Sequence, residues 1–229
     1  MQAVILAAGR GTRMGDMTAD IPKPLFRIGD RTRLEHTLSS LPDSVDEIIL
    51  VVNYHADKIR EAIGDSYDGI PVRYIHQTER LGTGHAVFAT REFVKGNFLV
   101  LMADDHYSKE SIERASEYPW SITVSREPVG RSDVDLSPDE NGFLNPGSQS
   151  VAQSDDGTIL MNTGLYSLTD AIFEHPLAPY KDTNEFSLPH TVLSLAEKYP
   201  IKILETKDWL QMNTPEQFET LKKTIGVDR

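Results

Sequence analysis

Short, nearly continuous apolar runs alternate along this chain with amphipathic stretches. Runs of this kind predict strands that are buried on both faces of a parallel sheet. They are Ala3–Ala7, Ile48–Asn53, Val72–Ile75, Phe98–Met102 and Ser121–Val124. The stretches between them carry apolar residues at helical spacing, and a glycine ends one of them as a stop signal. The alternation predicts a three-layer α/β fold with a mostly parallel central sheet, whose ligands bind at the carboxyl ends of the strands.

The pattern changes in the second half of the chain. Segment Arg126–Gly157 is rich in Ser, Asp, Pro, Asn and Gly, and it predicts a loop or loose hairpins. Regular structure is expected again over Ile159–Ser167, followed by a helix over about Leu188–Lys198. Thr214–Gln217 combines a cap residue, a first-turn proline and a capping-box glutamine. This order predicts a final helix.

Composition bounds the class of protein. The 229 residues suit a single domain over residues 1–229, and the absence of cysteine excludes a disulfide scaffold, a cysteine nucleophile and a thiolate zinc site. The longest apolar runs, Ala3–Ala8 and Phe98–Ala103, are far too short to cross a bilayer. We therefore expect a cytoplasmic protein without a membrane partner. The net charge of −12 argues against nucleic-acid binding, which needs a basic face.

A glycine-rich segment, Gly9–Gly15, follows the first predicted strand. Such a loop suggests a phosphate held by backbone N–H groups. Met14 stands where the dinucleotide fingerprint needs its third glycine, and the Gly-Lys-Ser/Thr end of a P-loop is absent. On the glycines alone, a tight turn between a strand and a helix is an equally good interpretation.

Lys23 stands between two prolines. Pro24 is expected to push Lys23 towards extended geometry, and Pro22 has a fixed φ, so the ammonium group should point in a set direction. Together with Arg13 it places two cations beside the glycine loop, which is local positive charge in an acidic chain. The alternative is a solvated loop lysine.

These residues resemble the signature of the sugar-nucleotide pyrophosphorylases, the nucleotidylyltransferase superfamily that joins a nucleoside triphosphate to a sugar 1-phosphate. The pattern Leu-Ala-Ala-Gly-x-Gly-Thr-Arg is present as Leu6–Arg13, and Pro-Lys-Pro-Leu is present as Pro22–Leu25. The resemblance implies a Rossmann-like nucleotidyltransferase fold. Residues 1–125 would form its nucleotide-binding half, and residues 126–229 the sugar-phosphate-binding half with the closing helix.

The same resemblance implies roles for individual residues of the glycine loop. Arg13 and Lys23 would be catalytic, because they would contact the triphosphate and the α-phosphoryl group in flight. The loop backbone would cradle the β and γ phosphates. The nucleotide-binding residues implied here are Leu6, Ala8, Gly9, Gly11, Thr12 and Arg13.

Segment Gln77–Ala86 resembles the base-reading segment of the uridylyl- and thymidylyltransferases. There a glutamine side chain and the backbone of a later glycine read the edge of uracil or thymine. Gln77 and Gly82 have the matching spacing, and Thr83 is expected to join them in binding the nucleotide. An amide offers both a donor and an acceptor to the imide and carbonyl of a pyrimidine. Without the resemblance, a polar loop entering a helix is an equally good interpretation.

A buried strand that ends in acids suits a Mg²⁺ ligand, since carboxylates at strand ends face the ligand edge of the sheet. The family's Gly-Asp pair lines up with Ala103-Asp104, so the resemblance favours Asp104 over Asp105 as the metal ligand. The family's Trp-x-Asp-x-Gly-Thr-Pro-Glu ending is similar to the segment that starts at Trp209. It implies that Asn213 is the second metal ligand, with Gln211, which stands where many members have Asp, as the alternative.

Segment Met161–Tyr166 resembles the family's Asn-Thr-Gly-Ile-Tyr segment, which borders the sugar. It implies that Asn162, Thr163 and Gly164 bind the substrate. The Glu-Lys-Pro segment that the family usually carries is missing around Gly142–Pro146, so the sugar stays unassigned. The histidines lack metal-ligand spacing and are expected to be loop or cap residues.

We therefore expect transfer of a nucleoside monophosphate from UTP or dTTP to a sugar 1-phosphate, with Mg²⁺ as cofactor and pyrophosphate as the leaving group. The partners would be a nucleoside triphosphate and a sugar 1-phosphate, and a homo-oligomer is left open. One alternative is guanylyl or cytidylyl transfer to a heptose, hexose or alcohol phosphate. Another is a non-catalytic nucleotide-sensing subunit with the same fold.

Overall fold

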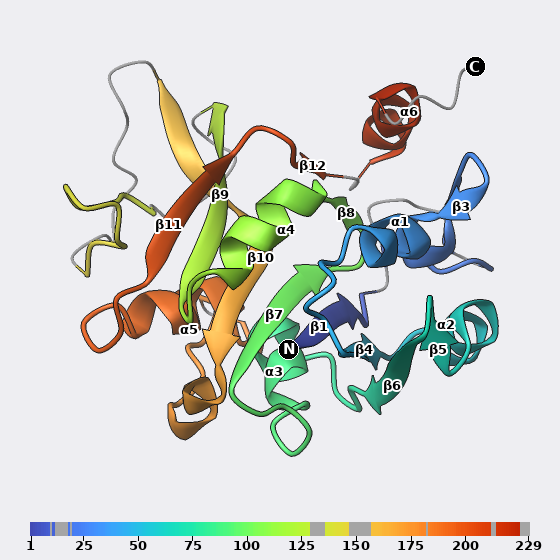
Figure 1. Ribbon diagram of the computed structural model, residues 1–229, viewed down its shortest axis with the longest axis horizontal. Coiled ribbons are helices and arrows are strands. Elements are labelled where there is room, and N and C mark those ends of the chain that lie inside the picture. Colours follow the sequence, from blue (N-terminus) through green and yellow to red (C-terminus); the bar gives the residue numbers. More distant parts are fainter. Residues whose placement is uncertain are drawn as a thin grey trace.

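The computed structural model describes residues 1–9, 11, 18, 20–128, 136–146, 157–181, 183–211 and 214–224. An eight-stranded sheet runs through the molecule in the order β11-β9-β10-β7-β1-β4-β6-β5, with helices on both of its faces (Figure 1). Its strands are β1 (Gln2–Ala7), β4 (Glu47–Val52), β5 (Ser66–Tyr67), β6 (Ile70–His76), β7 (Asn97–Met102), β9 (Ser121–Pro128), β10 (Thr158–Thr169) and β11 (Lys202–Thr206).

The centre of this sheet is parallel. Strand β1 lies between β4 and β7 and is parallel to both, and β6 continues the parallel pairing on the far side of β4. Strand β10 runs antiparallel to its neighbours β7 and β9, while β11 is parallel to β9. The expected mostly parallel α/β sheet is confirmed, and β10 is the strand that reverses direction within it.

Helices cover the sheet on two sides and make three layers. Alternate residues of β1 serve the two sides, as the side-chain period of a strand requires. Val4 and Leu6 pack with residues of α3 and α5, whereas Ala3, Ile5 and Ala7 pack with residues of α1, α2 and α4. The bounds of these helices are α1 (Arg33–Ser39), α2 (Ala56–Ile63), α3 (Gly82–Phe88), α4 (Lys109–Ser116) and α5 (Leu188–Ser194).

The last helix, α6 (Pro215–Thr224), begins with the predicted capping box. The backbone N–H of Thr214 donates to Gln217 Oε1 at 3.2 Å, and the backbone N–H of Gln217 donates to Thr214 Oγ1 at 3.3 Å. Phe218 is buried and its ring lies 5.7 Å from that of Phe26, measured between centroids. None of the helices in the described residues is long and apolar enough to cross a membrane.

Several predicted boundaries were wrong. Strand β9 continues to Pro128, three residues into the segment expected to be irregular, because its backbone stays paired with β10. In that segment residues 136–146 form isolated bridges, as loose hairpins do, and the remainder lies outside the described residues. Helix α5 ends at Ser194 rather than Lys198, and the chain continues in turns.

Short elements complete the fold. In the part of the chain that the structure describes, pairs of two-residue strands lie outside the main sheet, and 3-10 turns join longer elements. The pair β8–β12 matters for the site, because it connects the end of β7 to the segment before α6. These elements are η2 (Lys23–Leu25), β2 (Arg27–Ile28), β3 (Arg31–Thr32), β8 (Asp105–His106), η3 (Asp170–Glu174) and β12 (Leu210–Gln211).

Candidate active site

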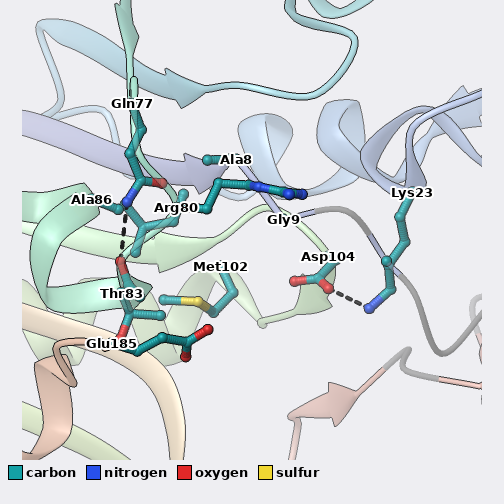
Figure 2. A pocket seen from close by; sticks show the side chains of 13 residues that line it. Ala8, Gly9, Lys23, Gln77, Arg80, Thr83, Ala86, Met102, Asp104 and Glu185 are labelled. Atoms are coloured by element: carbon teal, nitrogen blue, oxygen red, sulfur yellow. Dashed lines mark hydrogen bonds and ion pairs between the residues drawn. The ribbon is translucent and has the colours of Figure 1, made fainter. Parts of the chain in front are cut away.

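A cavity of about 570 Å³ lies at the carboxyl ends of β1, β6 and β7 (Figure 2). This is the edge at which ligands bind in parallel α/β sheets. The cavity brings together residues that the sequence predicted from four separate segments. They are Leu6, Ala8, Gly9, Gly11, Lys23, Gln77, Gly82, Thr83 and Asp104.

The remaining predicted site residues fall into two groups. Thr12, Arg13 and Asn213 lie outside the described residues, so their roles stay predictions. Asn162, Thr163 and Gly164 lie on β10, in the stretch where its pairing with β9 is irregular.

The hydrogen bonds of this β10 stretch are internal to the protein. Thr163 is 1% exposed and its hydroxyl donates to the carbonyl of Thr123 at 2.9 Å, while Asn162 Oδ1 accepts from the N–H of Gly164 at 2.9 Å. A Cβ built on Gly164 would lie 2.5 Å from Cγ of Met102, a cavity residue. The stretch thus supports the cavity wall from behind.

Four cavity residues were missed by sequence reasoning: Arg80, Ala86, Met102 and Glu185. The first two lie within the predicted base-reading segment, so that segment was their signal. Glu185 had no local signal. Long-range backbone bonds bring it to the cavity, since the N–H of Gly84 donates to the carbonyl of Phe186 at 2.9 Å.

The glycine loop approaches Lys23 closely. Gly11 has a φ of +65°, and a Cβ on it would lie 3.0 Å from Cγ2 of Thr18 and 3.3 Å from Cβ of Lys23. A side chain at this position would be strained in its backbone and crowded by its neighbours. Glycine therefore allows the loop backbone to lie against the lysine.

Lys23 is not extended, as the pre-proline rule had suggested, but begins the 3-10 turn η2. The turn is closed by a bond from the N–H of Leu25 to the carbonyl of Pro22 at 2.8 Å, and this bond outweighs the local steric bias. The ammonium direction is fixed in another way. The Lys23 side chain is only 5% exposed and forms an ion pair with Asp104, whose side chain is 30% exposed.

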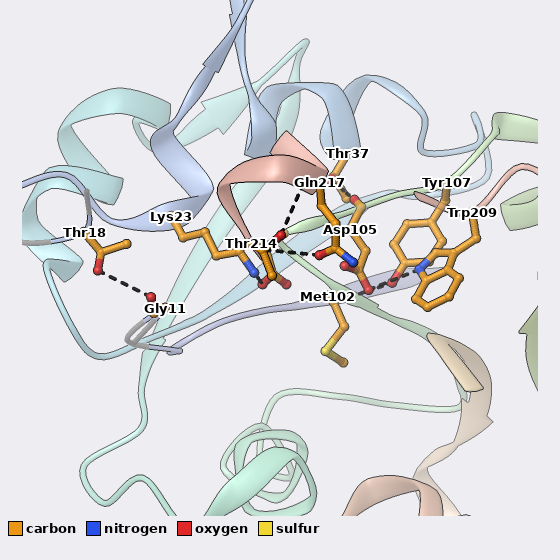
Figure 3. A network of polar contacts seen from close by, with 11 residues as sticks. Gly11, Thr18, Lys23, Thr37, Met102, Asp105, Tyr107, Trp209, Thr214 and Gln217 are labelled. Carbon is orange, nitrogen blue, oxygen red and sulfur yellow. Dashed lines mark hydrogen bonds and ion pairs between the residues drawn. The ribbon is translucent and has the colours of Figure 1, made fainter. Parts of the chain in front are cut away.

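The two adjacent acids after β7 differ in their surroundings, as Figure 2 shows for Asp104 and Figure 3 for Asp105. Asp104 lines the cavity, whereas Asp105 is buried and its Oδ2 accepts from Nε1 of Trp209 at 3.2 Å. Burial, and then the charge of Asp104, raise the pKa of Asp105 to about 7. The geometry thus presents Asp104 to a ligand and turns Asp105 towards the protein interior.

A fully buried arginine, Arg33 of α1, lies near the same acids. Burial lowers its pKa, and the charges of Asp105 and Asp104 partly oppose that shift. Within the part of the chain that the structure describes, its guanidinium nitrogens have no hydrogen-bond partner. The described residues also contain no cluster of three or more His, Cys, Asp or Glu side chains that could hold a metal ion.

Gln77 is 4% exposed, and both N–H groups of its amide are engaged. The amide nitrogen lies 3.2 Å from the carbonyl oxygen of Gly82 and 3.1 Å from Nδ1 of His85. The expectation that this amide offers both a donor and an acceptor is therefore corrected, because only its oxygen is left for a ligand. Thr83 closes this side of the cavity, where its hydroxyl accepts from the N–H of Leu188 at 3.1 Å.

Gly82→Ala is expected to destabilise the protein by about 1–3 kcal/mol more than Gly69→Ala. Both glycines have positive φ, so both substitutions carry backbone strain. A Cβ on Gly82 would lie 2.5 Å from the carbonyl oxygen of Phe186, whereas nothing lies within 4 Å of a Cβ on Gly69. Urea unfolding of the two variants measures the difference, and equal losses would show that the contact with Phe186 relaxes freely.

Comparison with known families agrees with this geometry. The model of the nucleotidyl transferase family matches residues 2–133, which is more than half of the chain. The chain belongs to the nucleotidyl transferase family. Within this nucleotidyl transferase, the matched region contains every described cavity residue except Glu185.

Curated relatives of this nucleotidyl transferase include a uridylyltransferase and a guanylyltransferase. The bifunctional protein GlmU of Methanococcus maripaludis is 31% identical over 217 residues, 91% of this chain and 50% of the relative. The UTP–glucose-1-phosphate uridylyltransferase AglF of Haloferax volcanii is 28% identical over 76% of this chain and 74% of the relative. The D-glycero-alpha-D-manno-heptose 1-phosphate guanylyltransferase of Campylobacter jejuni is 32% identical over 76% of this chain and 78% of the relative.

The nucleotidyl transferase spans about half the length of the GlmU relatives it matches. A solved structure of similar length is HddC from Yersinia pseudotuberculosis complexed with GMP-PN. Its TM-score is 0.70 at 26% sequence identity, and the match covers 98% of this chain and 99% of the HddC chain. The shared fold therefore extends over the whole described sheet and not only over the family-model region.

Proposed function

We propose that the chain transfers a nucleoside monophosphate from UTP or dTTP to a sugar 1-phosphate and releases pyrophosphate. The cavity carries this proposal, because a glycine turn, the Lys23–Asp104 pair and the Gln77 amide meet in it. A triphosphate would place its phosphates at the turn and its base at the amide. The relatives named for glucose 1-phosphate and heptose 1-phosphate support a sugar 1-phosphate as the acceptor.

In the proposed reaction an oxygen of the sugar 1-phosphate attacks the α-phosphorus in line. One P–O bond forms to that oxygen, and the P–O bond to pyrophosphate breaks. The attacking oxygen is already anionic, so the reaction needs no general base. The protein supplies positioning and charge neutralisation, with the Lys23 ammonium in the cavity and Arg13 proposed for the same role.

The donor set in the cavity suits Mg²⁺. This ion is usually held by one or two carboxylates together with substrate phosphates, and Asp104 presents a partly exposed carboxylate to the cavity. Asp104 and Asn213 would hold the ion, which when bound supplies positive charge to the phosphate oxygens. Lys23 holds the Asp104 carboxylate in place from its buried side.

On the acceptor side, the β10 stretch that includes Asn162 and Gly164 is proposed to border the sugar phosphate. It lies against Met102, which lines the cavity. Glu185 stands on the same wall as Thr83 and offers a carboxylate to hydroxyl groups (Figure 2).

Guanylyl transfer is the second candidate. It is favoured by the heptose 1-phosphate guanylyltransferase relative and by the HddC structure, which contains GMP-PN. Both matches cover at least three quarters of this chain, so the relationship includes the base-reading segment.

Pyrophosphate release measured with UTP, dTTP, CTP and GTP tests the proposal. We expect UTP and dTTP to exceed CTP by more than they differ from each other, because a wrong base edge leaves buried polar groups unpaired at about 1–3 kcal/mol each. Gln77→Ala should narrow the preference for UTP and dTTP over CTP more than it weakens triphosphate binding in general. The substitution leaves untouched the glycine turn at which the phosphates are proposed to bind.

The other outcomes separate the candidates. A clear preference for GTP would replace the uridylyl proposal with guanylyl transfer. Tight triphosphate binding without turnover, over a panel of sugar 1-phosphates, would instead favour a nucleotide-sensing role.

A further inference from the structure

The Gln77 amide is held in one orientation by two acceptors on α3. Gly82 and His85 are separated by one helical turn, so the Gly82 carbonyl and the His85 ring reach the same side of the helix. The amide nitrogen lies 3.2 Å from the first acceptor and 3.1 Å from the second.

The identity of the amide atoms follows from these contacts. A backbone carbonyl only accepts hydrogen bonds, so the atom facing Gly82 is the nitrogen and not the oxygen of Gln77. The second N–H of that nitrogen then points at Nδ1 of His85, which must accept. Nδ1 accepts only when it carries no proton, so His85 contributes as a neutral ring with its proton on Nε2.

The rest of Gln77 is equally fixed. Its backbone N–H donates to the carbonyl of Val52 at 2.9 Å, and its carbonyl accepts from Nδ2 of Asn53 at 2.6 Å. Helix α3 is itself anchored by the bond from Gly84 to Phe186. The backbone bonds keep Gln77 beside α3. If the amide turned over, it would lose its hydrogen bonds to both Gly82 and His85.

What remains for a ligand is the amide oxygen. The Gln77 nitrogen faces the Gly82 carbonyl, and Figure 2 shows the Gln77 oxygen turned towards the side of the cavity where Arg80 lies. A group that offers only an acceptor selects a base that has an N–H at the facing position. Uracil and thymine have such an imide N–H at N3 and guanine has one at N1, whereas cytosine N3 and adenine N1 carry lone pairs.

We propose that His85 is a positioning residue for base selection: by holding the Gln77 amide with its oxygen towards the cavity, it restricts the site to bases that present an imide N–H. The inference rests on the proposed function, because it assumes that the cavity binds a nucleoside triphosphate. It adds the chemical class of base that the site takes. It also assigns a role to a histidine that the sequence left as a loop or cap residue.

The test compares two kinds of His85 variant. His85→Leu and His85→Ala remove the acceptor, so the amide keeps only the Gly82 bond and can turn. His85→Asn restores an acceptor oxygen close to the position of Nδ1. Dissociation constants for UTP, GTP, CTP and ATP are measured by competition binding, and thermal unfolding of each variant verifies that it is folded.

We expect the UTP-to-CTP preference to fall by about three- to tenfold in His85→Leu and His85→Ala, which is the effect of one hydrogen bond. His85→Asn should stay within about twofold of wild type. A purely structural role for His85 would weaken binding of all four triphosphates together and leave the ratio unchanged. An unchanged ratio in either folded acceptor-free variant, or an equal fall in His85→Asn, overturns the inference.

Binding and turnover separate this inference from the proposed function. The wild-type protein could bind UTP and GTP more tightly than CTP and ATP but turn over none of them. That result would contradict the proposed function and would still support the role of His85. Wild type that binds CTP or ATP as tightly as UTP overturns the inference, whatever its turnover.

Discussion

Replacing Lys23 by alanine is expected to lower turnover by about 10²–10³-fold. The ammonium group lies in the cavity at the end of a side chain that is 5% exposed, and it pairs with Asp104. A cation held in this way is already oriented when negative charge develops on the transferred phosphoryl group and on pyrophosphate. Steady-state pyrophosphate release measures the loss, and triphosphate binding measured separately shows how much of it precedes the chemical step.

Two further variants isolate the charge. Lys23→Met keeps most of the buried stem, whereas alanine also leaves a void that destabilises the fold. Lys109→Met is the matched control, because Lys109 is a half-exposed lysine of α4 that pairs with Asp43, and its loss should leave turnover unchanged. If folded Lys23→Met works within a few-fold of wild type, Lys23 is not the cation that the reaction needs.

The central strands could be predicted because both faces of the sheet are covered. Residues of β1, β4 and β7 are almost all buried, so the sequence there has no polar face and the apolar run marks the strand. Strand β11 had no such mark, since the buried pair Ile203-Leu204 is followed by the exposed Glu205 and the apolar run is only two residues long there. The reversed direction of β10 is set by pairing with β7 and β9, which are distant in sequence.

In the site, too, local sequence predicted which residues take part, whereas contacts between distant segments set how they are oriented. Gly11, Lys23, Gln77 and Asp104 each belong to a short segment that follows a strand or closes a turn, so local motifs were enough to find them. Their orientations were not predictable. The backbone at Lys23 depends on a turn bond from Leu25, and Lys23 is therefore not extended as its proline neighbours suggested.

The amide of Gln77 shows why donor and acceptor counts from sequence are incomplete. A free glutamine offers both kinds of group, but two acceptors on α3 use its N–H groups before any ligand arrives. Glu185 reaches the cavity only through backbone bonds between two segments about one hundred residues apart. Neither fact has a signature within a single stretch of sequence.

Asp104→Asn is expected to reduce Mg²⁺-dependent turnover by about 10²-fold or more, and Asp105→Asn by about tenfold or less. Asp104 offers its carboxylate to the cavity, and an amide there removes the negative charge that a hard cation binds. Asp105 faces Trp209, and the amide oxygen of asparagine can still accept the indole N–H. Burial already raises the pKa of Asp105 to about 7, so a neutral side chain costs little at that position.

The comparison is sharp because the two acids are adjacent and both substitutions keep the size of the side chain. Pyrophosphate release is measured over a range of Mg²⁺ concentrations, and an excess of chelator should stop the wild-type reaction. A reversed order of the two variants would place the metal ligand at Asp105, and turnover that persists in chelator would remove the metal from the reaction. Thermal unfolding separates these outcomes from a folding defect, because Asp104→Asn removes the Lys23–Asp104 ion pair whereas Asp105→Asn leaves that ion pair intact.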